Sequence, residues 1–348
     1  MGVLSVMVEV DPAGEMAAEA PVIRALARLG LLCGEHTPRF TRLTGGVSSD
    51  IWRVDLARGP VCVKRALPKL RVEQDWFAPV ERNAYEAAWM RRAAAVAPEA
   101  VPQLLGQDDA AGVLVMAYLD PADHRLWKAD LRDGHADPDV ARAVGNRLVR
   151  IHAATANDPE VAAAFATEAI FYDIRLEPYL VASARAHPDR ADALNALAET
   201  TARTRRALVH GDVSPKNILT GPHGPIFLDA ECAWYGDPAF DLAFCLNHLL
   251  LKCLWTPGAA RDFLHCFDVL AKAYLAGVTW EPHGAVEART ARLLPGLFLA
   301  RVDGKSPVEY LTAEVAKDRV RRVARALLAH PVERVHRVRS AWARELAS

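Results

Sequence analysis

Hydrophobic and polar positions follow two different spacings along this chain. Residues 40–118 hold short apolar runs with the two-residue alternation of β-strands, separated by Gly and Pro. Beyond residue 121 the apolar positions recur at the spacing of amphipathic helices. The pattern therefore predicts an α+β protein, β-rich over residues 1–118 and mainly helical over residues 119–348.

Turn and cap residues give these elements approximate bounds. Asp11-Pro12 followed by an apolar stripe and Gly30 predicts a first helix over 12–29. Strands are predicted within 40–54 and at 61–64, 103–107, 112–118, 207–209 and 226–228. Further helices are predicted at 79–95, 138–155, 177–206, 240–254, 259–275, 286–300 and 308–328.

Three polar side chains follow the two buried strands predicted at 207–209 and 226–228. The first strand leads into HGDVSPKN, with Asp212 and Asn217, and the second into LDAE, with Asp229. One carboxylate can orient the proton of an attacking hydroxyl, while a carboxylate and an amide can hold magnesium against nucleotide phosphates. A lone Asp in a turn is more often a turn or cap residue. This ordered set on strand, loop and strand instead predicts phosphoryl transfer.

A lysine and a glutamate in the β-rich part extend this pattern. Lys64 ends the strand at 61–64, where a kinase keeps its phosphate-binding cation. Its expected partner is Glu86, at the centre of the next helix, whereas Glu81 lies nearer the helix start, where a carboxylate serves the dipole.

Two backbone segments are candidates for nucleotide binding. Small residues between paired strands let backbone N–H groups approach a phosphate, although an ordinary hairpin turn gives the same pattern. These residues are Gly45, Gly46, Ser48 and Ser49. The backbone at Ala117 and Leu119 would bind adenine if the strand before Pro121 leads into a linker, and a plain edge strand is the alternative.

Composition adds limits but no substrate. Hydrophobic residues make up 51% and charged residues 24% of 348 residues, which describes a soluble globular protein. A net charge of −1 gives no argument for a nucleic-acid or membrane partner. No signal peptide is expected, so a cytoplasmic protein with buried free thiols is predicted. The cysteines are Cys33, Cys62, Cys232, Cys245, Cys253 and Cys266.

The runs HGDVSPKNIL, LDAE and WYGDPAFDLA resemble those of the aminoglycoside phosphotransferase and choline kinase superfamily. The resemblance extends from about residue 40 to residue 328. It implies a two-lobe protein-kinase-like fold, with a β-rich N-lobe, a helical C-lobe, and ATP or GTP bound with Mg²⁺ in the cleft. It also implies Asp212 as catalytic base, Asn217 and Asp229 as magnesium ligands, Lys64 as phosphate clamp and Glu86 as its partner.

Asp241, in the D-P-x-x-D-L-A stretch, resembles a residue that braces the catalytic loop. Its alternative role is the N-cap of the helix that follows.

A closer branch is suggested by KRALPKLR, from Lys64 to Arg71, and by Trp76. These residues are similar to the K-x-A-L-P-x-x-R run of methylthioribose kinases, and Arg301 falls near where that branch places substrate-binding arginines. The catalytic loop lacks the G-D-L-H-T-G-S run of the branch. A sugar-like or other small hydroxylated acceptor is implied, with Arg71 and Arg301 in its site. Capping of its own helix is the alternative for Arg301.

The sequence therefore predicts a kinase that moves a γ-phosphoryl group to a hydroxyl of a small molecule. An antibiotic O-phosphotransferase is the runner-up, although aminoglycosides need an acidic pocket and residues 301–348 carry 11 Lys/Arg against 6 Asp/Glu. A silent pseudokinase and a nucleotide hydrolase are alternatives from other classes. The acceptor, the choice between ATP and GTP, and the oligomeric state stay open.

Overall fold

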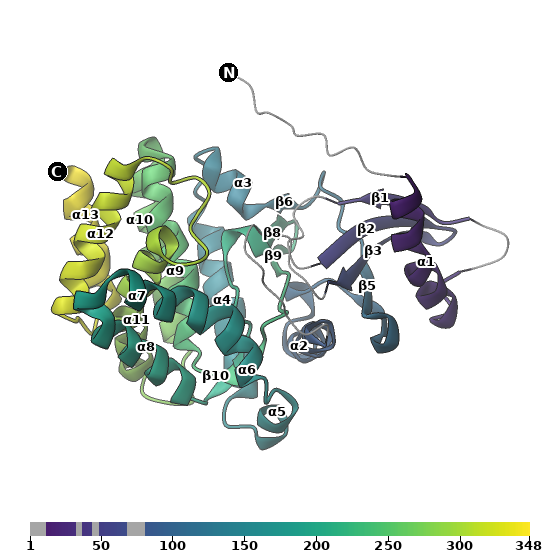
Figure 1. Ribbon diagram of the computed structural model, residues 1–348, viewed down its shortest axis with the longest axis horizontal. Coiled ribbons are helices and arrows are strands. Elements are labelled where there is room, and N and C mark those ends of the chain that lie inside the picture. The colour runs from purple at the N-terminus through teal and green to yellow at the C-terminus, as the bar shows by residue number, and fades with distance from the viewer. Residues whose placement is uncertain (1–11, 33–36, 44–48, 68–80) are drawn as a thin grey trace. The chain divides into compact units, whose positions relative to one another are not determined.

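The chain divides into two compact units, seen here in a computed structural model (Figure 1). The sheet unit comprises residues 1–87 and 103–118, and the helical unit comprises residues 88–102 and 119–348. The structure describes residues 12–32, 37–43, 49–67 and 81–348.

An antiparallel sheet forms the sheet unit, in the order β1-β2-β3-β5-β4. Alternating residues of β2 are buried, as the alternation of its sequence predicts. The strands are β1 (Arg39–Arg42), β2 (Ser49–Leu56), β3 (Gly59–Ala66), β4 (Leu104–Asp108) and β5 (Val113–Ala117).

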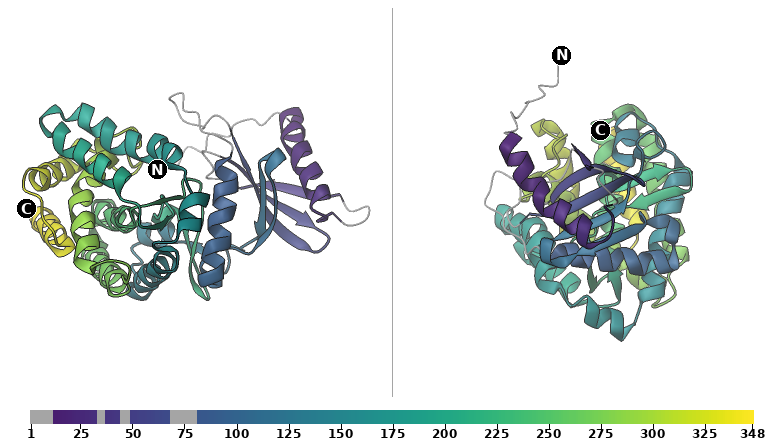
Figure 2. Two further views of the ribbon diagram at one scale, coloured as in Figure 1. Left: turned by 90° about the horizontal axis from the view of Figure 1, so that it is seen from below. Right: turned by 90° about the vertical axis from the view of Figure 1, so that its right-hand side faces the viewer.

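One face of this sheet is covered by α1 (Pro12–Arg28) (Figure 2). Val22 and Leu26 of α1 are fully buried in one core cluster with Trp52 and Val54 of β2. The next helix, α2 (Arg82–Val96), begins in the sheet unit and ends in the helical unit.

The helical unit holds short strands besides its helices. Strand β7 pairs with β10, and β8 pairs with β6 and β9. These strands are β6 (Arg125–Leu126), β7 (Ala207–Val209), β8 (Ile218–Gly221), β9 (Gly224–Phe227) and β10 (Trp234–Gly236). The helices are α3 (Trp127–Arg132), α4 (Pro138–Thr155), α5 (Pro159–Ala164), α6 (Glu168–Phe171), the π-helix η3 (Tyr172–Val181), α7 (Ala182–Ala186), α8 (Ala191–Arg203), α9 (Ala239–Trp255), α10 (Ala260–Ala276), α11 (His283–Asp303), α12 (Glu314–Ala329) and α13 (Val335–Ala347). Short 3₁₀ turns are η1 (Pro98–Ala100), η2 (Asp109–Ala111), η4 (Pro188–Arg190), η5 (Pro215–Asn217) and η6 (Pro257–Ala259).

Two predicted helices need correction. The helical region expected at 177–206 is interrupted at His187, because Pro188 cannot continue the hydrogen bonding of α7. The helix expected at 308–328 begins only at Glu314, because Val308 and Leu311 bury their side chains from a non-helical segment. Helix α13 was not predicted, although its buried Val and Trp positions have helical spacing.

Helix α9 runs through the core of the helical unit, as the most apolar stretch of the sequence predicts. The aromatic rings of Phe171 and Trp234 stack at 4.4 Å between centroids, and Phe240 of α9 meets Phe171 edge-on at 4.8 Å. Within the described residues, all five cysteines are free thiols. In that same part of the chain, no helix combines the length and the apolar character needed to cross a bilayer.

Candidate functional site

The loop between β7 and η5 holds Asp212, whose side chain is buried in the helical unit. Its Oδ2 lies 2.8 Å from Nη2 of Arg175 in the π-helix and 3.2 Å from Nζ of Lys216. Burial opposes ionisation of this carboxyl, but attraction to Arg175 and Lys216 outweighs it, so the pKa of Asp212 is lowered. The carboxylate is therefore ionised at neutral pH, with Oδ2 held by two cations.

The other oxygen of this carboxylate meets no donor among the residues that the structure describes. Oδ1 of Asp212 is buried and has no hydrogen-bond partner within the described part of the chain. An unsatisfied buried acceptor costs free energy, and a bound hydroxyl group would relieve that cost.

Asp241, in the first turn of α9, holds the backbone of this loop. Its Oδ2 accepts a hydrogen bond from the N–H of His210 at 2.7 Å, and its Oδ1 accepts one from Gly211 at 2.8 Å. His152 contacts Oδ2 at 3.2 Å through Nε2 and is fully buried, which fits the structural role of a packed histidine. Asp241 thus braces the loop. The alternative role as N-cap is wrong, because Asp237 accepts from the first N–H of α9.

Gly211 is required by the backbone of the same loop. Its φ is +82°, and a Cβ at this position would lie 2.8 Å from the carbonyl oxygen of Cys232. Any other residue would combine left-handed backbone strain with a clash against a main-chain atom.

His210 links the loop to the segment that carries Asp229. Its Nδ1 accepts from the N–H of Asp212 at 3.1 Å, and its Nε2 donates to the carbonyl of Leu228 at 3.1 Å. Burial lowers the pKa of His210 against the opposing attraction of Asp241, so the ring is neutral. One neutral tautomer satisfies both contacts.

Asn217 and Asp229 form a donor set suited to magnesium. The Nδ2 of Asn217 donates to the carbonyl of Asp212 at 3.1 Å, so the amide oxygen points the other way. Asp229 has a φ of +67°, an uncommon backbone conformation for a residue other than glycine. Amide and carboxylate oxygens are hard ligands of the kind that Mg²⁺ prefers, so these residues fit that ion.

In the sheet unit, Lys64 of β3 and Glu86 of α2 form the ion pair that the sequence predicts. Nζ of Lys64 lies 2.6 Å from Oε2 of Glu86. The two residues are only 4% and 2% exposed, so the pair is buried. Glu81, the candidate passed over, is exposed.

The other predicted nucleotide-binding residues are only partly described. Ser49 is buried at the start of β2, whereas Gly45, Gly46 and Ser48 of the same candidate loop, and Arg71, lie outside the described residues. The N–H of Ala117 donates to the carbonyl of Gln103 at 2.8 Å. Its backbone donor is therefore occupied, and adenine binding would depend on the carbonyl of Ala117 and on Leu119.

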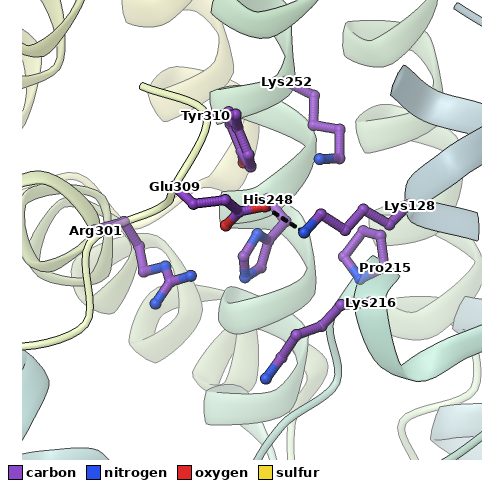
Figure 3. Close-up of a pocket in the computed structure, with 8 residues that line it drawn as sticks. All are labelled: Lys128, Pro215, Lys216, His248, Lys252, Arg301, Glu309 and Tyr310. Atoms are coloured by element: carbon purple, nitrogen blue, oxygen red, sulfur yellow. Dashed lines mark hydrogen bonds and ion pairs between the residues drawn. The ribbon is translucent and has the colours of Figure 1, made fainter. Parts of the chain in front are cut away.

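A pocket lies beside Lys216 and encloses about 250 Å³ of space not filled by atoms, part of it open to solvent (Figure 3). Arg301 of α11 lines this pocket together with Lys216, which forms an ion pair with Asp212. Nη1 of Arg301 donates to the hydroxyls of Tyr179 at 3.1 Å and Ser306 at 3.0 Å. The full lining is Lys128, Pro215, Lys216, His248, Lys252, Arg301, Glu309 and Tyr310.

The family model described as the phosphotransferase enzyme family matches residues 39–252. The chain belongs to this family. The methylthioribose kinase of Erwinia tasmaniensis is 28% identical over 232 residues, which cover 57% of this chain and 56% of that relative. The chain spans about half the length of the curated relatives it matches.

Solved structures of other phosphotransferases share the fold. A choline/ethanolamine kinase family protein from Mesorhizobium loti has a TM-score of 0.51 and 20% identity, covering 94% of this chain and 99% of that chain. An ethanolamine kinase of Plasmodium vivax has a TM-score of 0.54 and 10% identity, covering 99% and 90%. The predicted α+β, protein-kinase-like fold and the resemblance to this superfamily are confirmed.

Sequence reasoning missed several residues around Asp212. Arg175 lies 37 positions before it in the chain, as the two residue numbers show, and nothing local marks a buried arginine in a helical run as its partner. Lys216 lies within HGDVSPKN, but the motif gave no indication that it contacts Asp212. His248 and Lys252 lie in the apolar helix predicted at 240–254, and nothing in that pattern indicates that they line a pocket.

The bracing role of Asp241 predicts a stability effect. Asp241→Ala leaves the N–H groups of His210 and Gly211 without their acceptor, so the free energy of unfolding should fall by roughly 2–4 kcal/mol. Asp241→Asn keeps one acceptor oxygen and should lose about half as much. Urea unfolding followed by circular dichroism measures both, and an alanine variant as stable as wild type would show that Asp241 holds nothing in place.

Proposed function

We propose that this chain transfers the γ-phosphoryl group of ATP or GTP to a hydroxyl of a small sugar-like or otherwise hydroxylated metabolite. The observation that carries the proposal is the buried, ionised Asp212, which has one oxygen held by cations and the other without a donor in the described part of the chain. The family assignment and the methylthioribose kinase relative support the same reaction class.

Asp212 would act on the acceptor hydroxyl. The hydroxyl donates its proton to the free Oδ1, which aims a lone pair of the acceptor oxygen at the γ-phosphorus. As the new O–P bond forms, the bond from the γ-phosphorus to the bridging oxygen breaks, ADP or GDP leaves, and the proton passes to Asp212. Because the pKa of this carboxyl is lowered, the proton would pass to Asp212 late in the reaction. The main role of Asp212 would therefore be to orient the acceptor hydroxyl.

The negative charge on the phosphates would be offset by a bound magnesium ion and by lysine side chains. Bound Mg²⁺ supplies positive charge to phosphate oxygens, and Asn217 and Asp229 would hold it. Lys64, fixed by Glu86, would add a second cation. Lys216 reaches the Asp212 carboxylate and is half exposed, so it could also contact the transferred group.

The alternatives gain less support. A silent pseudokinase would be expected to lack the base, a metal ligand or the lysine, and this chain has all of them. A hydrolase would need a water in place of the acceptor, which product analysis can distinguish from transfer.

Loss of the candidate base tests the mechanism. Asp212→Asn keeps the shape of the side chain but removes the proton acceptor, so kcat for ADP formation with an accepted substrate should fall about 10²–10⁴-fold. Nucleotide affinity should stay unchanged. Asp192→Asn, at an exposed position of α8, serves as control. A full rate in Asp212→Asn would remove Asp212 from the chemistry.

The metal assignment is tested by calorimetry. Wild-type protein should bind AMP-PNP more tightly with Mg²⁺ than with EDTA, and Asp229→Asn should lose most of that difference because one carboxylate ligand is gone. The control is Asp123→Asn, an exposed aspartate. If Asp229→Asn responds to Mg²⁺ as strongly as wild type, the ion is held elsewhere.

The buried ion pair predicts separate effects on stability and on binding. Lys64→Met removes one partner and should lower the free energy of unfolding by roughly 3–5 kcal/mol. The double variant Lys64→Met/Glu86→Gln should recover much of this loss, because the carboxylate that paired with Lys64 is then replaced by a neutral amide. Both variants should bind nucleotide more weakly than wild type. A double variant with wild-type nucleotide affinity would show that the pair is structural only.

A further inference from the structure

The pocket beside Lys216 carries an excess of positive charge. Four of its lining residues are cations, each from a different element of the helical unit, and Glu309 is the one carboxylate in the lining. Glu309 forms an ion pair with Lys128, shown as a dashed line in Figure 3. The lining therefore carries more positive than negative charge. Outside the lining, Lys216 also contacts Asp212.

Two of these cations are buried. Arg301 is 7% exposed and Lys252 is 1% exposed. Among the residues that the structure describes, neither forms an ion pair with a carboxylate. Arg301 donates to neutral hydroxyl and carbonyl oxygens, while Nζ of Lys252 lies 4.1 Å and 4.2 Å from the ring centres of Trp255 and Tyr310. Burying charge without an opposite charge is unfavourable, so these two cations would be stabilised by a negatively charged group in the pocket.

The pocket also contains polar atoms without partners. In the described structure, Nε2 of His248, Nε of Arg301 and the hydroxyl of Tyr310 are buried and make no hydrogen bond. His248 is 6% exposed, and burial together with the surrounding cations keeps its pKa well below the usual value. Its neutral ring can still donate one hydrogen bond. Figure 3 shows Arg301 and Lys128 directed toward His248 from opposite sides.

We propose that this pocket binds an oxyanion group, a carboxylate or a phosphate, of the small hydroxylated acceptor. An oxyanion offers the acceptor oxygens that the unpartnered donors lack, and it supplies the negative charge that Arg301 and Lys252 lack. The inference rests on the proposed function for the hydroxyl at Asp212, and it names the chemical class of the acceptor. It also disfavours an aminoglycoside acceptor, because a polycation would meet like charges.

The size of the pocket agrees with this class. Part of its roughly 250 Å³ is open to solvent, so the enclosed part is smaller still and suits one small charged group.

Matched pairs of probes test the proposal by calorimetry on the full chain. D-Glycerate is compared with glycerol, and D-ribose 5-phosphate with D-ribose, each with and without Mg²⁺ and AMP-PNP. At least one anionic probe should bind about tenfold or more tightly than its neutral counterpart, the gain of one charge-assisted hydrogen bond. A carboxylate-only or phosphate-only preference identifies the source of the oxyanion and supports the proposal in either form.

Two variants assign this preference to the pocket. Arg301→Gln and Lys252→Met should each weaken binding of the anion about tenfold while leaving the neutral probe unaffected. Lys252→Met removes a buried charge and keeps an apolar stem against Trp255, so it should fold even if Arg301→Gln does not. The controls are Arg322→Gln and Lys272→Met, both exposed.

The pH dependence gives an independent readout. Burial and the nearby Lys128 and Arg301 lower the pKa of Lys252 to about 7, against the opposing attraction of Glu309. Lys252 is therefore charged below this pH and neutral above it, with the Tyr310 ring packed on its other side. Affinity for D-glycerate, whose carboxylate stays ionised throughout, should fall as pH rises from 6 to 8 in wild type, and this change should disappear in Lys252→Met.

The outcomes separate this inference from the proposed function. Neutral probes or kanamycin binding as tightly as the anions, or an anion preference that survives in both pocket variants, would overturn the oxyanion site. If a neutral sugar is phosphorylated while anions do not bind, the kinase proposal stands and the inference falls. If anions bind through Arg301 but no hydroxylated probe is phosphorylated, the oxyanion site stands and the kinase proposal fails.

Discussion

The carboxylate of Asp241 is the constraint on which the candidate site depends. It accepts hydrogen bonds from two successive backbone N–H groups, those of His210 and Gly211, directly before Asp212. These N–H groups are buried, so water cannot replace the carboxylate. Because α9 carries Asp241 through the core, the position of the loop is tied to the packing of the whole helical unit. His210 then transmits this position to the carbonyl before Asp229.

Lys216 lies between two sets of charged groups in the helical unit, because it contacts Asp212 and also lines the pocket that contains Arg301 and Lys252. On one side, Asp212 is a buried carboxylate kept ionised by Arg175, with one oxygen left for a proton donor. On the other side, the cations Arg301 and Lys252 are buried without a carboxylate partner in the described residues. A molecule with a hydroxyl and an oxyanion group would satisfy both sides. Structural stabilisation alone does not account for Arg301 and Lys252, because a buried charge without an opposite charge lowers stability.

The sequence could predict features that depend on short motifs and on the alternation of neighbouring residues. HGDVSPKN and LDAE made Asp212, Asn217 and Asp229 candidates because both runs follow short buried strands. The alternation around Lys64 indicated its ion pair with Glu86, which the structure contains. Partners brought together by packing could not be found this way. Arg175 meets Asp212 through an irregular helical segment that carries no local signal. The pocket likewise joins α3, α9, α11 and the segment after α11, and apolar residues in that last segment were mistaken for a helix.

The most direct measurement of the central claim is ³¹P NMR of wild-type protein with Mg²⁺, ATP and a mixture of small hydroxylated acids and sugars. The account predicts a new phosphate monoester resonance that grows in step with ADP. Growth of inorganic phosphate alone would show hydrolysis, and an unchanged ATP spectrum would show that the protein does not turn over ATP. Either result would contradict the assignment of Asp212 as the group that directs an acceptor hydroxyl.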